Sequence, residues 1–290
     1  MIRYLQHTEI ERDKWDRCIA GAAFESLYPY SWYLDLVSPG WEGLIKGDYE
    51  SVMPLTRSKK YGFNMLLQPI LAQQLGVFSE DLPGEDELQE FVRAIPSRFR
   101  YVDICMNIHN SQLPGRISRR ARVNYELDLK SPANYNSNTK RNIRKGRVHP
   151  FEFREISVDD YLELKYSSEG RITVNRPYPE KLFTGLKKLD RARVFGLFLE
   201  RDMHAAAVLG FAETRVIYMN GCSGIKGKET RAMFVLMDQL IQRSRDKFPV
   251  FDFEGSNLPG VARFFEGFGA YKTFYYRMVR AKFPFVGWMR

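Results

Sequence analysis

The strongest hydrophobic periodicity in the chain lies between Thr230 and Lys247. The apolar residues of this segment recur at i, i+3, i+4, i+7 and i+8, and they are Met233, Leu236, Met237, Leu240 and Ile241. This spacing places them on one face of an α-helix. The pattern therefore predicts an amphipathic helix that packs its apolar face on a sheet.

Three short runs with the pattern of strands precede this helix. They lie at Val194–Leu199, Ala205–Ala212 and Val216–Asn220, and the polar turns between them are short enough for hairpins. The runs predict an antiparallel meander. The connection Gly221–Glu229 contains spaced glycines, and we expect a loop there.

The remaining elements alternate between strands and helices along the chain. After the long helix come a strand at Val250–Glu254, a helix at Val261–Gly267 and a strand at Tyr271–Arg280. Before the meander we expect strands at Ile2–Leu5, Gly43–Gly47, Ser51–Thr56, Leu66–Phe78, Tyr101–Asn107, Ala121–Leu129 and Phe151–Ile156, and helices at Ile10–Ala22, Asp86–Ile95, Val158–Ser168 and Pro179–Leu189. This order predicts an α/β protein with a mixed sheet and flanking helices.

A break rich in Ser, Pro and Asn, Lys130–Asn138, divides this order of elements. A chain of 290 residues is long enough to form two domains of ordinary size. We therefore expect an N-terminal domain at residues 1–130 and a C-terminal domain at residues 131–290.

The composition is that of a globular protein without an integral membrane segment. Hydrophobic residues make up 44% of the chain and charged residues 27%. No apolar run approaches the ~18 residues that a membrane-spanning helix needs, and the first residues lack the apolar core of a signal peptide. Three cysteines (Cys18, Cys105 and Cys222) and four histidines are scattered, so we expect reduced thiols, no metal site and a cytoplasmic protein.

The net charge of +9 is unevenly distributed along the chain. Residues 1–130 hold 16 Lys+Arg and 18 Asp+Glu, a net charge of −2, whereas residues 131–290 hold 28 and 17, a net charge of +11. A positive field attracts phosphate groups. Nucleic acid, coenzyme A and nucleotide-linked sugars are the partner classes that carry such groups.

The segment Thr139–Arg147 concentrates cations next to the break. Lys140, Arg141, Arg144 and Lys145 recur at i, i+1, i+4 and i+5, so a helix would display them on one side. They are candidates for a contact with phosphate or RNA, although the interleaved aromatic residues of a base-stacking surface are absent from the segment. The alternative is a solvated helix between the domains.

Glycines and cations also precede the long helix. The candidates for an anion site there are Gly224, Lys226, Gly227, Lys228, Thr230 and Arg231. Glycines let a phosphate approach the backbone, and the free amides and dipole of a helix N-terminus favour an anion. The alternative is a solvated loop in which Thr230 caps the helix.

Two carboxylates lie at the end of the strand that follows the long helix. Asp252 and Glu254 are two residues apart, so on a strand their side chains share a face. Either could accept a proton from a substrate amine, and Glu254 lies closer to the strand's end. Asn257 could orient a substrate or donate to an oxyanion. The alternatives are acids that bind Arg263 or a backbone turn, and an Asn that belongs to an ordinary helix start.

Two local sequences carry a resemblance to a known family. TKRNIRKG at residues 139–146 and FDFEGSNLPGVARFFEGFGA at residues 251–270 resemble the two signatures of the FemAB-like proteins. The order of meander, loop, helix, strand, helix and strand is similar to the GNAT acyltransferase fold. The resemblance implies two GNAT-type domains, with a degenerate N-terminal domain on the acceptor side and a C-terminal domain on the donor side.

The activity that this resemblance implies is N-acyl transfer to an amine. Members of the FemAB group take an aminoacyl unit from transfer RNA and attach it to a peptidoglycan precursor, whereas GNAT enzymes use acyl-coenzyme A. In both, an amine attacks a carbonyl directly, without a permanently bound cofactor. We therefore expect a small-molecule or peptide amine as acceptor, bound in the cleft between the domains, and acyl-coenzyme A or aminoacyl-tRNA as donor.

Three departures from the family pattern leave alternatives open. Residues 222–231 read CSGIKGKETR, which is not the Gln/Arg-x-x-Gly-x-Gly/Ala loop of GNAT enzymes. Phe265 stands where aminoacyl-transferring members commonly have lysine, and the long helical hairpin often found in transfer-RNA-dependent members is absent from the sequence. The alternatives are a FemAB-type transferase acting on a cell-wall precursor with aminoacyl-tRNA, and a catalytically degenerate GNAT scaffold that binds phosphorylated ligands or RNA.

Overall fold

The computed structural model describes residues 1–60, 62–112, 118–168, 177–256 and 258–281, which form two compact units. Unit 1 comprises Met1–Val123 and Phe274–Arg290, and unit 2 comprises Asn124–Thr273. Two strands, β8 (Ser118–Asp128) and β14 (Tyr271–Ala281), cross the boundary, so the end of the chain belongs to unit 1. The division predicted from the sequence, 1–130 and 131–290, contains no such return.

Unit 2 is built on a sheet with the strand order β8-β13-β12-β11-β10-β9. β10 (Ala192–Leu199), β11 (Asp202–Phe211) and β12 (Arg215–Ser223) form an antiparallel meander, which confirms the prediction. β12 pairs in parallel with β13 (Val250–Asp252), and β9 (Glu152–Glu155) lies at the edge beside β10. This arrangement is the mixed sheet that the order of elements indicated.

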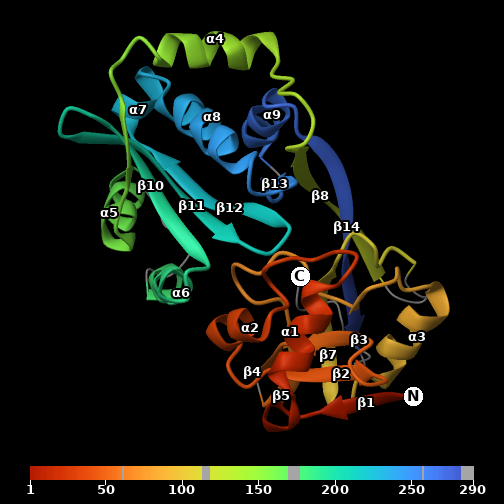
Figure 1. The fold of residues 1–290 in the computed structure, drawn as a ribbon. Coiled ribbons are helices and arrows are strands. Elements are labelled where there is room, and N and C mark those ends of the chain that lie inside the picture. Colours follow the sequence, from red (N-terminus) through yellow and green to blue (C-terminus); the bar gives the residue numbers. More distant parts are fainter. Residues whose placement is uncertain (61, 113–117, 169–176, 257, 282–290) are drawn as a thin grey trace. The chain divides into compact units, whose positions relative to one another are not determined.

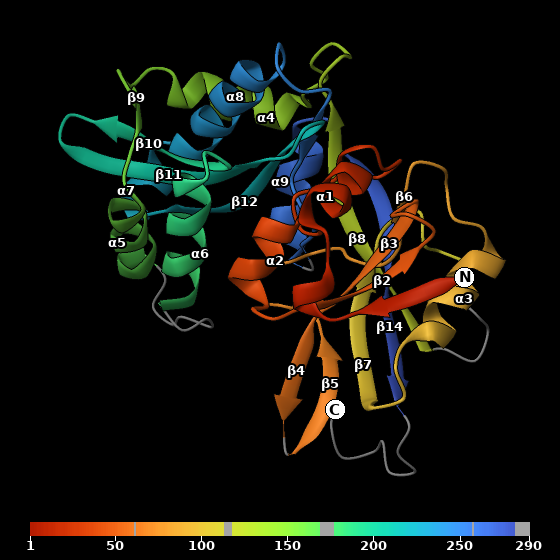
Figure 2. The same ribbon diagram turned by 60° about the horizontal axis from the view of Figure 1, so that its bottom comes forward.

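The burial of β11 explains why the sequence of this strand reads as a continuous apolar run. Every residue from His204 to Gly210 is buried. α8 (Ala232–Ser244) covers one face of the meander, while α5 (Val158–Ser168) and α6 (Pro177–Lys188) cover the other (Figures 1 and 2). A strand that is covered on both faces has no polar side to alternate with its apolar side.

Two further helices complete the layer that contains α8. α4 (Ser137–Gly146) buries Thr139, Ile143 and Gly146, and it contacts both α8 and α9 (Pro259–Gly267). The Asn136 side chain caps α4 by accepting a hydrogen bond of 2.8 Å from the Thr139 N–H. The basic segment is thus helical up to Gly146, and its cations Lys140, Arg141, Arg144 and Lys145 are exposed.

Unit 1 contains two groups of paired strands and the helices that cover them. The first group has the order β1-β2-β3-β6, from β1 (Ile2–Leu5), β2 (Glu42–Lys46), β3 (Ser51–Leu55) and β6 (Phe78–Ser79). The second contains β4 (Arg57–Lys60), β5 (Phe63–Leu67), β7 (Phe99–Met106) and β14. The helices are the short η1 (His7–Glu9), α1 (Arg12–Ala20), α2 (Ser31–Val37) and α3 (Glu85–Ala94).

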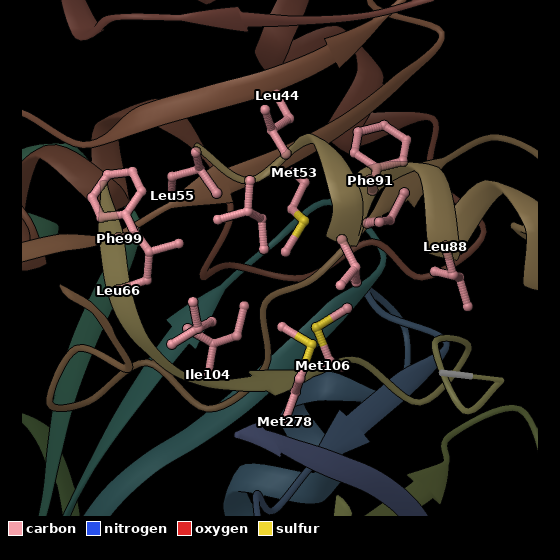
Figure 3. Packing of buried hydrophobic residues seen from close by; sticks show 14 residues of the cluster. Leu44, Met53, Leu55, Leu66, Leu88, Phe91, Phe99, Ile104, Met106 and Met278 are labelled. Atoms are coloured by element: carbon pink, nitrogen blue, oxygen red, sulfur yellow. The ribbon is translucent and has the colours of Figure 1, made fainter. Parts of the chain in front are cut away.

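The core of unit 1 joins its strands to α3. Phe91 of α3 and Leu44 of β2 are fully buried, and Ile104 and Met106 of β7 lie in the same cluster (Figure 3). Met278 of β14 also belongs to this cluster and has no exposed surface. β14 is thus fixed in unit 1 by its side chain as well as by its pairing with β7.

Two predicted elements differ from the structure. The expected strand Leu66–Phe78 is interrupted, because β5 ends at Leu67 and Leu71 adopts a left-handed φ of 64° within a turn. The expected loop Gly221–Glu229 is also wrong: β12 continues to Ser223, and a short helix, α7 (Ile225–Glu229), follows. The sequence pattern did not reveal α7, because its five residues are too few to show helical periodicity.

In the described part of the chain, none of the helices combines the length and the apolarity that a bilayer span needs. The three cysteines are free thiols. Cys105 and Cys222 are buried and Cys18 is half-buried. Burial raises the pKa of Cys18 to about 12 and that of Cys105 to about 11, so both stay protonated at neutral pH.

Candidate active site

A pocket of about 660 Å³ lies in unit 2 where β12 and β13 part. The two strands pair along Arg215–Ile217 and Val250–Asp252, after which β13 ends and β12 continues to Ser223. The walls come from the second half of β12, the segment after β13, the first turn of α8, α9 and the end of α5. The pocket therefore occupies an opening of the sheet, covered by helices.

A bulge in β12 shapes the floor of this pocket. Val208 of β11 pairs with Asn220 and Leu209 pairs with Tyr218, so Met219 is an extra residue on β12. In a regular strand, Tyr218 and Gly221 would point to opposite faces, because they are three residues apart. Here a Cβ atom on Gly221 would lie 1.9 Å from the Tyr218 hydroxyl. The bulge thus turns Tyr218 toward the pocket, and only glycine leaves room for its hydroxyl.

Tyr218 is a hydrogen-bond donor in the pocket at neutral pH. Its ring contacts the Phe265 ring edge-on, with 6.0 Å between ring centroids. Burial raises the pKa of Tyr218 above its ordinary value of about 10, so the hydroxyl keeps its proton.

A cation at the pocket wall, Lys165, is held by an amide side chain. The Lys165 ammonium of α5 donates to the Asn220 side-chain oxygen at 2.9 Å, and the buried Tyr161 hydroxyl donates to the same oxygen at 2.8 Å. Lys165 and Asn220 both line the pocket. α5 therefore supplies a positive charge close to the bulge of β12.

The two predicted carboxylates do not share a face, because the strand ends between them. β13 stops at Asp252, and Glu254 has a left-handed φ of 60°. The Glu254 N–H donates to an Asp252 carboxylate oxygen at 2.8 Å, and the Tyr125 N–H donates to the Glu254 carbonyl at 3.1 Å. Glu254 is half-buried and lines the pocket, whereas Asp252 is buried outside it.

Asp252 belongs to a buried ion network. Arg215 donates to Asp252 at 3.1 Å and to Glu126 at 3.0 Å, and all three side chains are at most 8% exposed. Asn124 donates to the other Asp252 oxygen at 3.0 Å, and the Tyr271 hydroxyl donates to Glu126 at 3.3 Å. Burial raises the pKa of Asp252, Arg215 opposes this shift, and Glu126 adds to it. The network holds the turn that presents Glu254.

The candidate anion segment around α7 divides into two groups. Gly227, Lys228 and Arg231 line the pocket, whereas Gly224, Lys226 and Thr230 do not. Lys226 forms an ion pair with Asp202 outside the pocket. α8 begins after Arg231, which has a left-handed φ of 60°, instead of at Thr230.

Packing on β11 fixes the position of α7. A Cβ atom on Gly227 would lie 1.8 Å from the His204 carbonyl oxygen, so the helix backbone rests directly on β11. The Thr230 hydroxyl lies 3.0 Å from the His204 ring nitrogen Nδ1. Burial lowers the pKa of His204. The contact places Lys228 and Arg231 at the pocket.

The cations of α4 lie on the solvent side of that helix, away from the pocket walls. Lys140, Arg141, Arg144 and Lys145 are all exposed. Lys140 and Arg144 border a smaller hollow of about 360 Å³ between α4 and α8. At the end of the helix, Arg147 forms an ion pair of 2.6 Å with the buried Asp238 of α8.

Sequence reasoning missed Tyr218, Asn220 and Lys165. Lys165 lies 55 residues before Asn220, and no local pattern joins them. The alternative considered for Asp252 was a bond to Arg263 or to a backbone turn: Arg263 is exposed, and Asp252 binds Arg215 and the N–H of Glu254 in the turn. Asn257 lies outside the described residues. No group of three or more His, Cys, Asp or Glu residues that could hold a metal ion occurs in the described part of the chain.

Comparisons with solved structures identify the fold. FemX superposes with a TM-score of 0.70 at 11% identity, over 94% of this chain and 96% of that one. A tandem GNAT protein from the clavulanic acid biosynthesis pathway gives 0.56 at 9% identity, over 98% and 100%. L-PGS from Bacillus licheniformis gives 0.54 at 12% identity, over 85% of each chain. No protein-family model and no curated protein sequence matches the chain.

The class of fold follows from these likenesses. The chain has the FemAB-like, tandem GNAT fold, a mixed α/β architecture that it shares with FemX and with the tandem GNAT protein. The expected fold class is therefore confirmed. At 9–12% identity the likeness extends to the fold alone, and the reaction has to be argued from the pocket.

Proposed function

We propose that this chain is an N-acyltransferase that moves an acyl group from an activated ester to an amine in the pocket of unit 2. One observation carries the proposal. The Glu254 carboxylate, the Tyr218 hydroxyl and the bulged backbone of β12 border a single pocket, where the sheet opens between β12 and β13. They can serve as the general base, the hydrogen-bond donor to the leaving group and the donor to the oxyanion, which are the groups that direct acyl transfer uses.

The reaction is a direct displacement. The amine nitrogen attacks the acyl carbonyl, so an N–C bond forms, and the bond from the carbonyl carbon to the donor's sulfur or oxygen breaks. Glu254 accepts the amine proton, directly or through a water molecule. Asp252 acts as a positioning residue, because its carboxylate accepts a hydrogen bond from the Glu254 N–H.

Two further groups stabilise the negative charges that develop on the carbonyl oxygen and on the leaving group. The pairing of β12 with β13 ends at Ile217, where the pocket begins, which suits the β12 backbone beyond this point to donate to the oxyanion. The Tyr218 hydroxyl donates a hydrogen bond to the departing thiolate or alkoxide. Asn257, which the sequence suggested for the oxyanion, remains a second candidate donor.

The segment Gly224–Arg231 is the proposed donor-phosphate site. Its cations Lys228 and Arg231 line the pocket, and Gly227 brings the backbone of α7 close to β11. Acyl-coenzyme A fits this arrangement, because its pyrophosphate would meet the cations while its thioester reaches Tyr218 and Glu254. A small-molecule or peptide amine is the acceptor.

A second donor class is favoured by a separate observation. Residues 131–149 contain five Lys and Arg and no Asp or Glu, and Lys140, Arg141, Arg144 and Lys145 lie exposed on α4. Such a surface suits a polyanion. The FemAB-type alternative is therefore an aminoacyl-tRNA donor carried on α4, with a cell-wall precursor as acceptor.

One experiment tests the proposal and separates the donors. Acetyl-, butyryl- and hexanoyl-coenzyme A and transfer RNA would each be added in a thermal-shift assay, because a ligand of the folded state raises the melting temperature. A shift with a coenzyme A ester supports the leading proposal, and a shift with transfer RNA alone supports the alternative. No shift with any of them would overturn both donor assignments.

The proton acceptor is tested by Glu254→Gln. We expect this variant to keep the donor-induced thermal shift and to lose about 10²- to 10⁴-fold in turnover with an amine acceptor, because the amide cannot take the proton. Glu163→Gln, at an exposed position of α5, is the matched control and should retain full turnover. Equal turnover in the two variants would remove Glu254 from the reaction.

A further inference from the structure

One end of the pocket is apolar and lies between the start of α8 and α9. Met233 and Phe234 of α8 and Val261 and Phe264 of α9 are half-buried there, and all of them line the pocket. Leu258, just before α9, also lines the pocket and is 66% exposed. Five apolar side chains thus share one open surface, where scattered exposed apolar residues would have no common site.

This apolar surface is backed by a rigid layer of aromatic rings. The Phe234 and Phe264 rings meet edge-on, with 4.9 Å between centroids, and Phe264 lies 6.0 Å from Phe265. Phe265 in turn lies 4.9 Å from the Phe253 ring. Phe253, Phe265 and Phe268 are at most 4% exposed, so the layer cannot easily rearrange to admit water.

In the described part of the chain, α9 contributes no charged side chain to the pocket walls. The ionisable residues Arg263 and Glu266 of α9 are absent from the pocket walls, and Glu266 pairs with Lys272 at 2.8 Å. Among the described residues, the charged side chains that line the pocket are Glu254 and the cations Lys165, Lys228 and Arg231. A positively charged acyl group would meet like charges and lose its hydration against phenylalanine rings.

We infer that the acyl group transferred by this protein is uncharged and apolar, and larger than acetyl. The inference rests on the proposed function, because it assigns the apolar end to the acyl chain of the donor. The pocket volume of about 660 Å³ leaves room beyond a two-carbon chain. Phe265, which stands where aminoacyl-transferring relatives commonly carry lysine, is here one ring of the wall that receives the chain.

The test uses binding of coenzyme A esters to the full chain, measured by isothermal titration. Each added methylene should lower the dissociation constant about fourfold, so butyryl-coenzyme A should bind about 15-fold more tightly than acetyl-coenzyme A. β-Alanyl-coenzyme A matches the butyryl ester in length but ends in an ammonium group. It should bind no more tightly than acetyl-coenzyme A.

Two variants and one control show whether the preference for the longer acyl chain arises at the apolar end. Phe264→Ala should remove most of the preference for butyryl over acetyl, whereas Phe274→Ala, at a phenylalanine that is 51% exposed on β14, should leave it unchanged. Val261→Phe narrows the same end without removing a ring, so it should reverse the order of butyryl and acetyl. This second variant keeps the test valid if Phe264→Ala does not fold.

The outcomes separate the inference from the proposed function. Equal binding of acetyl and butyryl esters, or tighter binding of the β-alanyl ester than of the butyryl ester, would overturn the inference and leave the acyltransferase proposal standing. A failure of free coenzyme A and of every ester to bind would overturn the coenzyme A donor, and the inference with it.

Discussion

Arg215 is the residue on which the buried network of unit 2 depends most. Its guanidinium lies between two buried carboxylates, those of Glu126 and Asp252, and the three side chains are at most 8% exposed, so water screens their charges little. Removal of the one cation would leave two carboxylates buried together, which costs far more than the loss of an exposed ion pair.

We expect Arg215→Met to lower the free energy of unfolding by about 3–5 kcal/mol at neutral pH. Burial raises the pKa of Asp252 in the folded protein, and without the opposing cation this pKa lies further above that of the unfolded chain, about 4. The folded variant then binds more protons than its unfolded state, so its stability falls as pH rises through the folded pKa of Asp252. Urea unfolding at pH 5 and pH 8 should show the larger deficit at pH 8.

A matched control for this change is available at the surface. Arg191 pairs with Glu213 at 2.9 Å, but the two side chains are 35% and 52% exposed. Arg191→Met should cost less than about 1 kcal/mol at both pH values. If the Arg215→Met deficit is the same at pH 5 and pH 8, the two carboxylates are not the reason for it.

At the scale of elements, α7 shows how tertiary packing can reverse a local preference. Alanine normally stabilises a helix relative to glycine by about 1 kcal/mol. At Gly227, however, the added Cβ would meet the His204 carbonyl oxygen at 1.8 Å and the Ser223 hydroxyl at 2.5 Å. The helix would have to move away from β11, and Lys228 and Arg231 would move with it.

Gly227→Ala should therefore destabilise the protein by about 1–3 kcal/mol through overpacking, and weaken acyl-coenzyme A binding. Gly224→Ala is the matched control for the packing argument, because its Cβ would meet only Leu164, at 3.7 Å. The urea midpoints of the two variants and their dissociation constants for butyryl-coenzyme A are the measurements. Equal midpoints for the two variants would contradict the packing argument.

The sequence predicts elements well where periodicity is long, and predicts the site only in part. The meander and α8 could be predicted, because each of their elements has a run of five or more residues in which the buried positions produce a recognisable pattern of apolar residues. Glu254, Lys228 and Arg231 were identified because each lies next to a predicted element, and all three line the pocket. The bulge at Met219 could not be predicted, because one extra residue in a strand leaves the composition of the run unchanged.

Contacts between distant segments account for the rest of what the sequence did not reveal. Asp252 pairs with Arg215, which lies 37 residues earlier in the sequence. Lys165 donates a hydrogen bond to Asn220, which lies 55 residues later. Both pairs depend on how strands and helices stack, which a single sequence does not specify. The apolar end of the pocket likewise combines α8 and α9, whose aromatic residues read individually as ordinary core positions.

At the scale of the whole molecule, the return of the chain to unit 1 changes the distribution of charge. Unit 2 holds 25 Lys+Arg and 19 Asp+Glu, a net charge of +6, and the rest of the chain holds 19 and 16, a net charge of +3. Both units are therefore basic, because residues 274–290 carry four cations and no acid. The cations of α4 matter as a local cluster and not as part of a uniformly positive half.

The same return makes unit 1 depend on the end of the chain for its core. Met278 is completely buried among residues of α3 and β7, such as Leu88 and Met106 (Figure 3). Met278→Ala should cost about 2–5 kcal/mol. Because the cavity lies in unit 1, hydrogen exchange should accelerate in peptides from α3 and β7 and stay unchanged in β11.

Hydrogen exchange read by mass spectrometry localises this loss, and Phe274→Asp provides the control. Phe274 lies on the same strand but is 51% exposed, so a polar residue there should leave exchange in α3 and β7 close to that of the unchanged protein. Faster exchange of β11 in Met278→Ala, to the same extent as in β7, would show that unit 1 does not unfold by itself. No acceleration at all would mean that β14 is not needed to complete the core of unit 1.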